Sequence, residues 1–142
     1  MVLKNAQKPF RNPTPEMNRI SGDVVDAAFK VHFALGPGLL ESVYQTCLVH
    51  KIRQKNLRVE TQVDLPITFE GVSLESGLRL DLLVDKKLVV EIKAVESLLP
   101  VHEAQLLTYL KITGCELGLL INFNVPVLKE GIKRIVFSKR NN

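Results

Sequence analysis

Two consecutive apolar segments of the chain carry charged side chains of the kinds found in hydrolytic sites. Asp81 lies in the first segment, 78–84, and Glu91 and Lys93 lie in the second, 88–95; most other residues in both segments are aliphatic. Side chains alternate between the two faces of a β-strand, so Glu91 and Lys93 share one face if the second segment is a strand. The position of Asp81 relative to that face decides whether the three groups form one site.

The turn between the two segments determines where Asp81 lies. A hairpin centred on Lys86 places Asp81 directly opposite Glu91 and on the same face. A two-residue loop centred between Lys86 and Lys87 would change the register and send Asp81 to the other face. A shared site therefore requires a turn with an odd number of residues, which a structure can test.

Two buried carboxylates side by side need a positive partner. At a separation of about 4 Å they repel by roughly 4 kcal/mol at an effective dielectric constant of 20, and burial increases this penalty. A divalent cation such as Mg²⁺ or Mn²⁺ removes it, because these cations prefer oxygen ligands. Lys93 on the same face would orient or deprotonate a water, or stabilise the charge that develops on a phosphate. The alternative is a solvated strand face on which Glu91 and Lys93 form an ordinary charge pair.

Helices are expected on both sides of these strands in the sequence. The threonine, proline and glutamate at 14–16 are typical of a helix start, and apolar residues recur at helical spacing as far as Leu35. The glycine, proline and glycine at 36–38 end this helix, and a second helix is expected through 40–56. A third helix begins at Pro100 and ends at Gly114.

Short apolar runs with turn residues between them predict the strands. The expected strands are 57–63, 65–69, 72–74, 78–84, 88–95, 117–123 and 132–137. The order of elements is two helices, a β-meander, a helix, and one or two strands. This order predicts a mixed β-sheet flanked by helices, in the α/β to α+β range.

Length and composition are those of one globular domain with a mildly basic surface. The chain has 142 residues, a formal net charge of +4 and a pI of about 9.2. We expect a flexible tail at 1–13, a single domain at 14–138 and a short tail at 139–142. Neither a membrane span nor a secretory signal is recognisable, which predicts a cytoplasmic protein. The positive charge favours a nucleic-acid partner.

The residues from Gly38 to Tyr44 reproduce the pattern G-x-x-E-x-x-Y, with Glu41 at its centre. Here the chain resembles the GxxExxY proteins, which are assigned to the PD-(D/E)xK nuclease superfamily. The resemblance spans about residues 16–137. It continues through the segments 79–84, 90–94, 102–110 and 118–123, although Leu80 stands where the superfamily pattern has proline.

This resemblance implies a restriction-endonuclease-like core and a role for each matching residue. Asp81 and Glu91 would bind the metal, and Lys93 would be the catalytic lysine. Glu41 would supply the additional acid that superfamily members often carry on an early helix. Gln105 would be the polar residue that points at the active site from the helix after the E-x-K strand.

Three further residues are candidates for substrate contact. His102 and Tyr109 form a polar stripe with Gln105 at helical spacing, but His102 has no second histidine or cysteine at metal-site spacing and so is not expected to be a ligand. Tyr44 is a candidate because it shares a helix face with Glu41. The alternative for Tyr44 is a core aromatic residue with a paired hydroxyl.

The sequence therefore predicts a metal-dependent nuclease, a hydrolase that acts on phosphodiester bonds of DNA or RNA. One alternative is a catalytically idle module that keeps the fold in order to bind nucleic acid or a protein partner. Another is a small-molecule phosphohydrolase or nucleotide-binding domain, although no base- or sugar-reading motif is recognisable. The short apolar strands would also allow a homodimer through a sheet edge.

Overall fold

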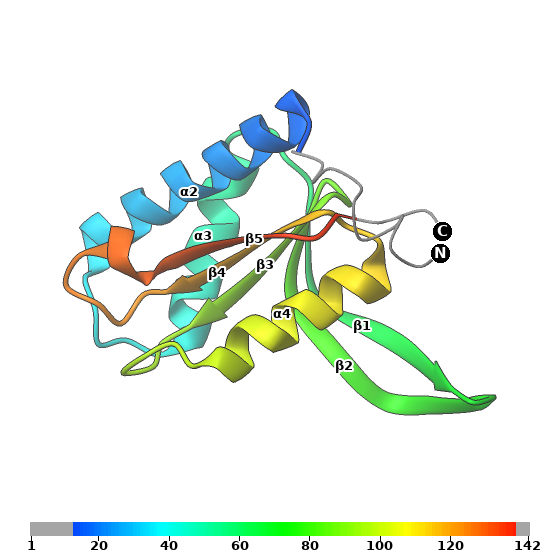
Figure 1. The fold of residues 1–142 in the computed structure, drawn as a ribbon. Coiled ribbons are helices and arrows are strands. Elements are labelled where there is room, and N and C mark those ends of the chain that lie inside the picture. The colour runs from blue at the N-terminus through cyan, green and yellow to red at the C-terminus, as the bar shows by residue number, and fades with distance from the viewer. Residues whose placement is uncertain (1–12, 139–142) are drawn as a thin grey trace, which may run out of the picture.

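The computed structural model describes residues 13–138, apart from the side chains of Glu75 and Ser76. Residues 1–12 and 139–142, which make up nearly all of the expected tails, lie outside the described residues. The helices are α2 (Pro15–Leu35), α3 (Glu41–Arg53), α4 (Pro100–Thr113) and the short 3-10 helix η1 (Leu128–Gly131). The strands are β1 (Val59–Phe69), β2 (Val72–Val84), β3 (Leu88–Lys93), β4 (Leu117–Asn122) and β5 (Ile132–Val136). Figure 1 shows their arrangement.

The strands form one five-stranded mixed sheet in the order β1-β2-β3-β4-β5. β1, β2 and β3 are an antiparallel meander, β3 and β4 are parallel, and β5 returns antiparallel to β4. A parallel pair needs a long crossover connection, and α4 provides it between β3 and β4. The predicted mixed sheet with helices against it is therefore confirmed.

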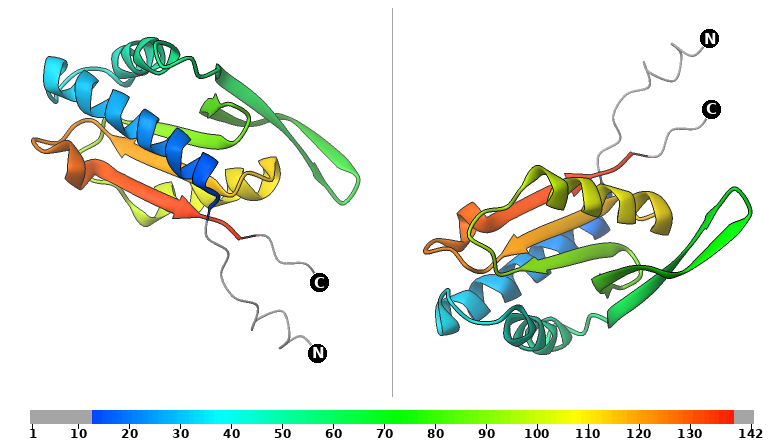
Figure 2. Two further views of the ribbon diagram at one scale, coloured as in Figure 1. Left: turned by 90° about the horizontal axis from the view of Figure 1, so that it is seen from above. Right: turned by 90° about the horizontal axis from the view of Figure 1, so that it is seen from below.

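Helices cover both faces of the sheet, as Figure 2 shows from opposite sides. α2 and α3 pack on one face, in a core cluster that includes Val90 and Ile92 of β3. α4 packs on the other face, in a cluster that includes Val89 and Leu120. Because side chains alternate along β3, Glu91 has the same orientation as Val89 and points toward the α4 layer. The buried α4 residues are Leu106, Tyr109 and Leu110.

The β1–β2 hairpin is longer than the sequence suggested. The two runs expected at 57–63 and 65–69 are one strand, and the runs at 72–74 and 78–84 are also one strand. β1 lies at the edge of the sheet, where proline is tolerated, and a register shift between Leu65 and Ile67 accommodates Pro66. The distal part of this hairpin projects beyond the rest of the domain (Figure 1).

The first two helices begin and end where the sequence predicted, within a few residues. Thr14 caps α2, because its Oγ1 accepts the Met17 N–H at 3.2 Å. Gly36 and Gly38 then adopt positive φ angles of 69° and 99°, a region that glycine enters without a Cβ clash. Among residues 13–138, no helix is long and apolar enough to cross a membrane.

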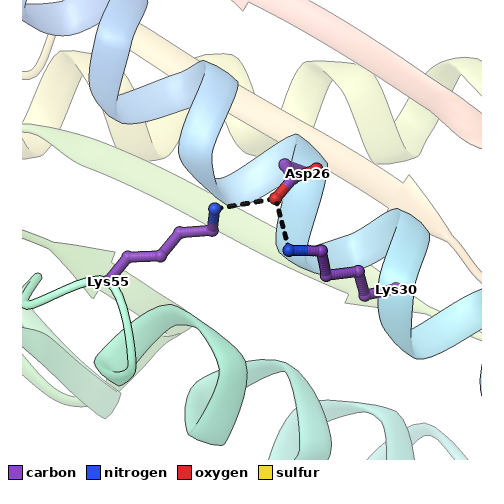
Figure 3. Close-up of polar contacts among 3 residues, drawn as sticks. All are labelled: Asp26, Lys30 and Lys55. Atoms are coloured by element: carbon purple, nitrogen blue, oxygen red, sulfur yellow. Dashed lines mark hydrogen bonds and ion pairs between the residues drawn. The ribbon is translucent and has the colours of Figure 1, made fainter.

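An ion-pair network on the surface joins the two helices that cover the first face. Asp26 of α2 accepts from Lys55, just after α3, at 2.7 Å, and from Lys30 at 3.2 Å (Figure 3). The hydrogen bond from Lys55 and that from Lys30 lower the pKa of Asp26. The network is exposed, so its contribution to stability is small.

Candidate active site

The register of the β2–β3 hairpin meets the condition for a shared site. In this hairpin Leu82 pairs with Val90, Leu83 with Val89, and Val84 with Leu88. These pairs are centred on Lys86, with a three-residue loop at 85–87. Asp85 and Lys86 both adopt positive φ, and the Lys87 N–H closes the loop on the Val84 carbonyl at 2.9 Å. The next step of this register places Asp81 opposite Glu91.

At that next step, side chains replace the backbone ladder. The Asp81 N–H donates to Glu91 Oε2 at 2.8 Å, and the Ile92 N–H donates to Asp81 Oδ2 at 2.7 Å. Each strand thus gives one amide to the carboxylate of the other strand. Both distances are at the short end of the range for an N–H donor and an oxygen acceptor. One oxygen of each carboxylate is fixed by this exchange.

The Glu91 carboxyl is buried, with only 3% of the residue exposed. Burial, followed by the charge of Asp81, raises its pKa to about 8. The Asp81 N–H and the Lys93 ammonium oppose this increase without cancelling it. Without a cation, Glu91 therefore holds a proton at neutral pH.

Glu41 joins the same group from α3, where it is the first residue. The residue as a whole is exposed, but protein atoms around its carboxyl displace water. This loss of hydration is the main cause of the raised pKa of Glu41. Asp81 raises this pKa further and Lys93 lowers it. Glu41 is thus electrostatically coupled to both Asp81 and Lys93.

α4 contributes Tyr109 to the group. This residue is only 3% exposed, and burial, then the charges of Glu91 and Asp81, raise its pKa to about 12. Its hydroxyl therefore keeps its proton and can donate a hydrogen bond. Gln105 lies four residues earlier on the same helix face and is partly exposed.

His102 and Tyr44 have local structural contacts. His102 Nδ1 accepts the Leu99 N–H at 3.0 Å, which caps the start of α4. Tyr44 is fully buried and stacks on Phe123 with ring centroids 4.6 Å apart. Its hydroxyl donates to the Gly36 carbonyl at 2.6 Å and accepts the Leu39 N–H at 3.1 Å. The structure thus gives Tyr44 the position of a core aromatic residue that holds the turn before Glu41.

Two polar residues that the sequence reading did not single out support the group. Asn122 is 1% exposed; its Oδ1 accepts the Val95 N–H at 3.0 Å and its Nδ2 donates to the Val95 carbonyl at 2.9 Å. It thereby fixes the segment that follows Lys93. The second is Gln62 of β1, whose Nε2 lies 3.4 Å from Asp81 Oδ1. A polar residue at the end of the apolar run 117–123 was a readable signal for Asn122, whereas Gln62 had none.

Comparison with protein families identifies the superfamily of the chain. A sequence model of the PD-(D/E)XK nuclease superfamily matches residues 18–135, which is most of the chain. The chain belongs to the PD-(D/E)XK nuclease superfamily. Comparisons with curated proteins and with solved structures give no match. The α+β architecture is the restriction-endonuclease-like fold of this superfamily, and membership supports a nuclease-type function.

PD-(D/E)XK nucleases generally depend on a divalent metal. Within residues 13–138, no group of three or more His, Cys, Asp or Glu side chains is arranged to hold a metal ion. Mg²⁺, however, is usually bound by only one or two carboxylates together with waters. Asp81 and Glu91 provide two carboxylates, each with one oxygen fixed by a backbone amide. This donor set fits a hard divalent cation.

Proposed function

We propose that the protein is a Mg²⁺- or Mn²⁺-dependent nuclease that hydrolyses phosphodiester bonds of DNA or RNA. One observation carries the proposal: the Glu91 carboxylate accepts the Asp81 N–H and the Asp81 carboxylate accepts the Ile92 N–H across the interrupted hairpin. Nothing in strand pairing requires two acids at this point, and an ordinary ladder would use carbonyl oxygens instead. Placing two acids together is unfavourable unless a cation or a proton compensates.

Each residue of the group has a distinct proposed role. Asp81 and Glu91 hold the cation, which when bound supplies positive charge at the scissile phosphate and activates water. Lys93 adds the positive charge that stabilises the phosphate as the bond breaks. Glu41 holds a water or the cation from the α3 side. Tyr109, Gln105 and His102, all on α4, are the proposed contacts to substrate.

The signature from Gly38 to Tyr44 supports assignment to the GxxExxY proteins within the superfamily. Gly38 has a φ of 99°, which disfavours any residue with a Cβ. Glu41 is electrostatically coupled to Asp81 and Lys93, and the Tyr44 hydroxyl bonds to the turn on both sides of Pro37. The three signature residues thus correspond to a turn, a site acid and the tyrosine that holds the turn.

Cleavage assays with matched variants test the proposal. Wild type, Asp81→Asn and Lys93→Ala are incubated with single- and double-stranded DNA and RNA in Mg²⁺ or Mn²⁺. We expect cleavage by wild type, and a decrease of 10²-fold or more in both variants, on the order found when a charge-stabilising group is removed. Chelation of the metal should abolish cleavage.

Two control variants carry the same substitutions away from the group. Asp64 is exposed on the hairpin and pairs with Arg79, so Asp64→Asn should cleave as wild type does. Lys111 is exposed on α4, so Lys111→Ala should do the same. Equal cleavage by all five proteins would indicate a contaminating nuclease and refute the mechanism. Tight nucleic-acid or protein binding without cleavage would instead favour the idle module.

A further inference from the structure

β1 passes Asp81 without pairing to it. Thr61 pairs with Leu82 and Val63 pairs with Leu80, but no pair joins Gln62 and Asp81 between them. Gln62 has a φ of 49°, which is uncommon for a residue with a side chain. The pairing of β2 with β3 also stops before Asp81. Asp81 is therefore unpaired with both neighbouring strands, β1 and β3.

The Gln62 side chain contacts both α3 and Asp81 at this irregularity. Its Nε2 donates to Gln45 Oε1 at 2.8 Å and lies 3.4 Å from Asp81 Oδ1. Gln45 is in α3, one helical turn after Glu41, and so lies on the same helix face. A continuous line of amides therefore runs from α3 through β1 to the carboxylate of Asp81.

The two oxygens of Asp81 have different partners. Oδ2 accepts the Ile92 N–H from β3, whereas Oδ1 faces the Gln62 amide from β1. Contacts from the strands on both sides restrict rotation of the carboxylate about its last bond. Gln62 is exposed, so this amide also lies at the solvent side of the candidate site.

We propose that Gln62, held by Gln45, is a positioning residue for Asp81. The inference rests on the proposed function and concerns the cation affinity of the pair rather than the chemical step. Hydrogen-bond partners of metal-binding carboxylates commonly change metal affinity by 10- to 100-fold when they are removed. The positive φ of Gln62 is thus the backbone conformation that brings an amide to Asp81.

A glycine variant at position 62 tests the effect of the side chain apart from that of the backbone conformation. Gln62→Gly keeps a φ of 49° without strain and removes the whole side chain with its amide, so we expect the Mn²⁺ affinity of the full chain, measured by calorimetry, to fall about 10-fold or more. Gln45→Ala, at a partly exposed position of α3, should lower the affinity less and in the same direction. The double variant should match Gln62→Gly, because the two amides act in series.

Glu70→Gly is the matched control. Glu70 also has a φ of 49° but lies at the distal turn of the same hairpin. The Mn²⁺ affinity of the Glu70→Gly variant should therefore equal that of wild type. Wild-type affinity in both Gln62→Gly and Gln45→Ala overturns the inference. The Asp81→Asn variant distinguishes failure of this inference from failure of the proposed metal site. If the variant binds Mn²⁺ as wild type does, or if wild type does not bind Mn²⁺, the proposed metal site fails as well. If only Asp81→Asn loses affinity, the metal site stands and the role of Gln62 is refuted.

Discussion

The Glu91 carboxyl couples the candidate site to the stability of the metal-free protein. Its pKa is raised from 4.5 to about 8 in the folded state, first by burial and then by Asp81. Between these two values the folded protein binds more protons than the unfolded chain, so the free energy of unfolding falls as the pH rises. We expect a loss on the order of a few kcal/mol between pH 5 and pH 9, measured by urea unfolding with a chelator present.

Glu91→Gln isolates this effect. The amide oxygen of glutamine can still accept the Asp81 N–H, but the side chain does not titrate. The variant should therefore lose much less stability between pH 5 and pH 9 than wild type does. Parallel pH profiles for the two proteins would show that Glu91 titrates normally in the folded state.

At the residue scale, the sequence predicted that Asp81 and Glu91 lie together only on the condition that the β2–β3 hairpin is centred on Lys86. Glu91 and Lys93 share a face for any straight strand, whereas Asp81 depends on the loop at 85–87. Asp85 and Lys86 in that loop adopt positive φ. Because neither residue is glycine, nothing in the sequence indicated this conformation. The same limit applies to Gln62, whose unusual backbone follows from contacts with other strands and α3.

The turn between α2 and α3 sets the position of Glu41 at the scale of elements. Gly36 has a φ of 69° and a ψ of −176°, a region occupied almost only by glycine. Gly36→Ala should therefore destabilise the protein by about 1–3 kcal/mol. It should also disturb the bond from the Tyr44 hydroxyl to the Gly36 carbonyl. Thermal or urea unfolding provides the measurement.

Gly22 is the control for the same substitution. It lies within α2, it is exposed, and an added Cβ would meet nothing within 4 Å. Alanine is the better helix former, so Gly22→Ala should stabilise the protein by up to about 1 kcal/mol. Similar effects at both glycines would contradict the role assigned to the turn.

The sequence predicted the type and order of elements better than their lengths. Apolar spacing and the glycine turns were enough for the three α-helices. The long strands β1 and β2 were each divided into two runs, because polar residues or glycine interrupt the apolar pattern at Asp64 and at 75–77. Pro66 lies within β1, where an edge position with a register shift tolerates it. β3 ends at Lys93, short of the expected Val95, because the Val95 backbone bonds to the Asn122 side chain.

At the scale of the whole molecule, the spacing between α4 and the sheet depends on Gly118. A Cβ added there would lie 2.9 Å from Leu106 Cδ1, closer than such atoms approach. Gly118→Ala should therefore push α4, which carries Tyr109 and Gln105, away from the sheet and destabilise the protein by about 1–3 kcal/mol. Urea unfolding measures this loss.

A double-mutant cycle checks the cause. Leu106→Ala alone should destabilise by about 2–5 kcal/mol, because it leaves a cavity in the α4 layer. With Leu106→Ala present, Gly118→Ala should no longer clash, so the double variant should lose less stability than the two single losses together. Additive losses would mean that the layers are not in contact through this pair.

The amide protons of Asp81 and Ile92 are each bound by a carboxylate oxygen, whereas the amides further along the hairpin follow ordinary strand pairing. In an NMR spectrum, these two protons would report the charge of the acid pair without a probe attached to it. Protonation of Glu91 weakens the bond from the Asp81 amide directly and reaches the Ile92 amide only through Asp81. A larger movement of the Asp81 resonance than of the Ile92 resonance between pH 9 and pH 5 would therefore report the protonation of Glu91.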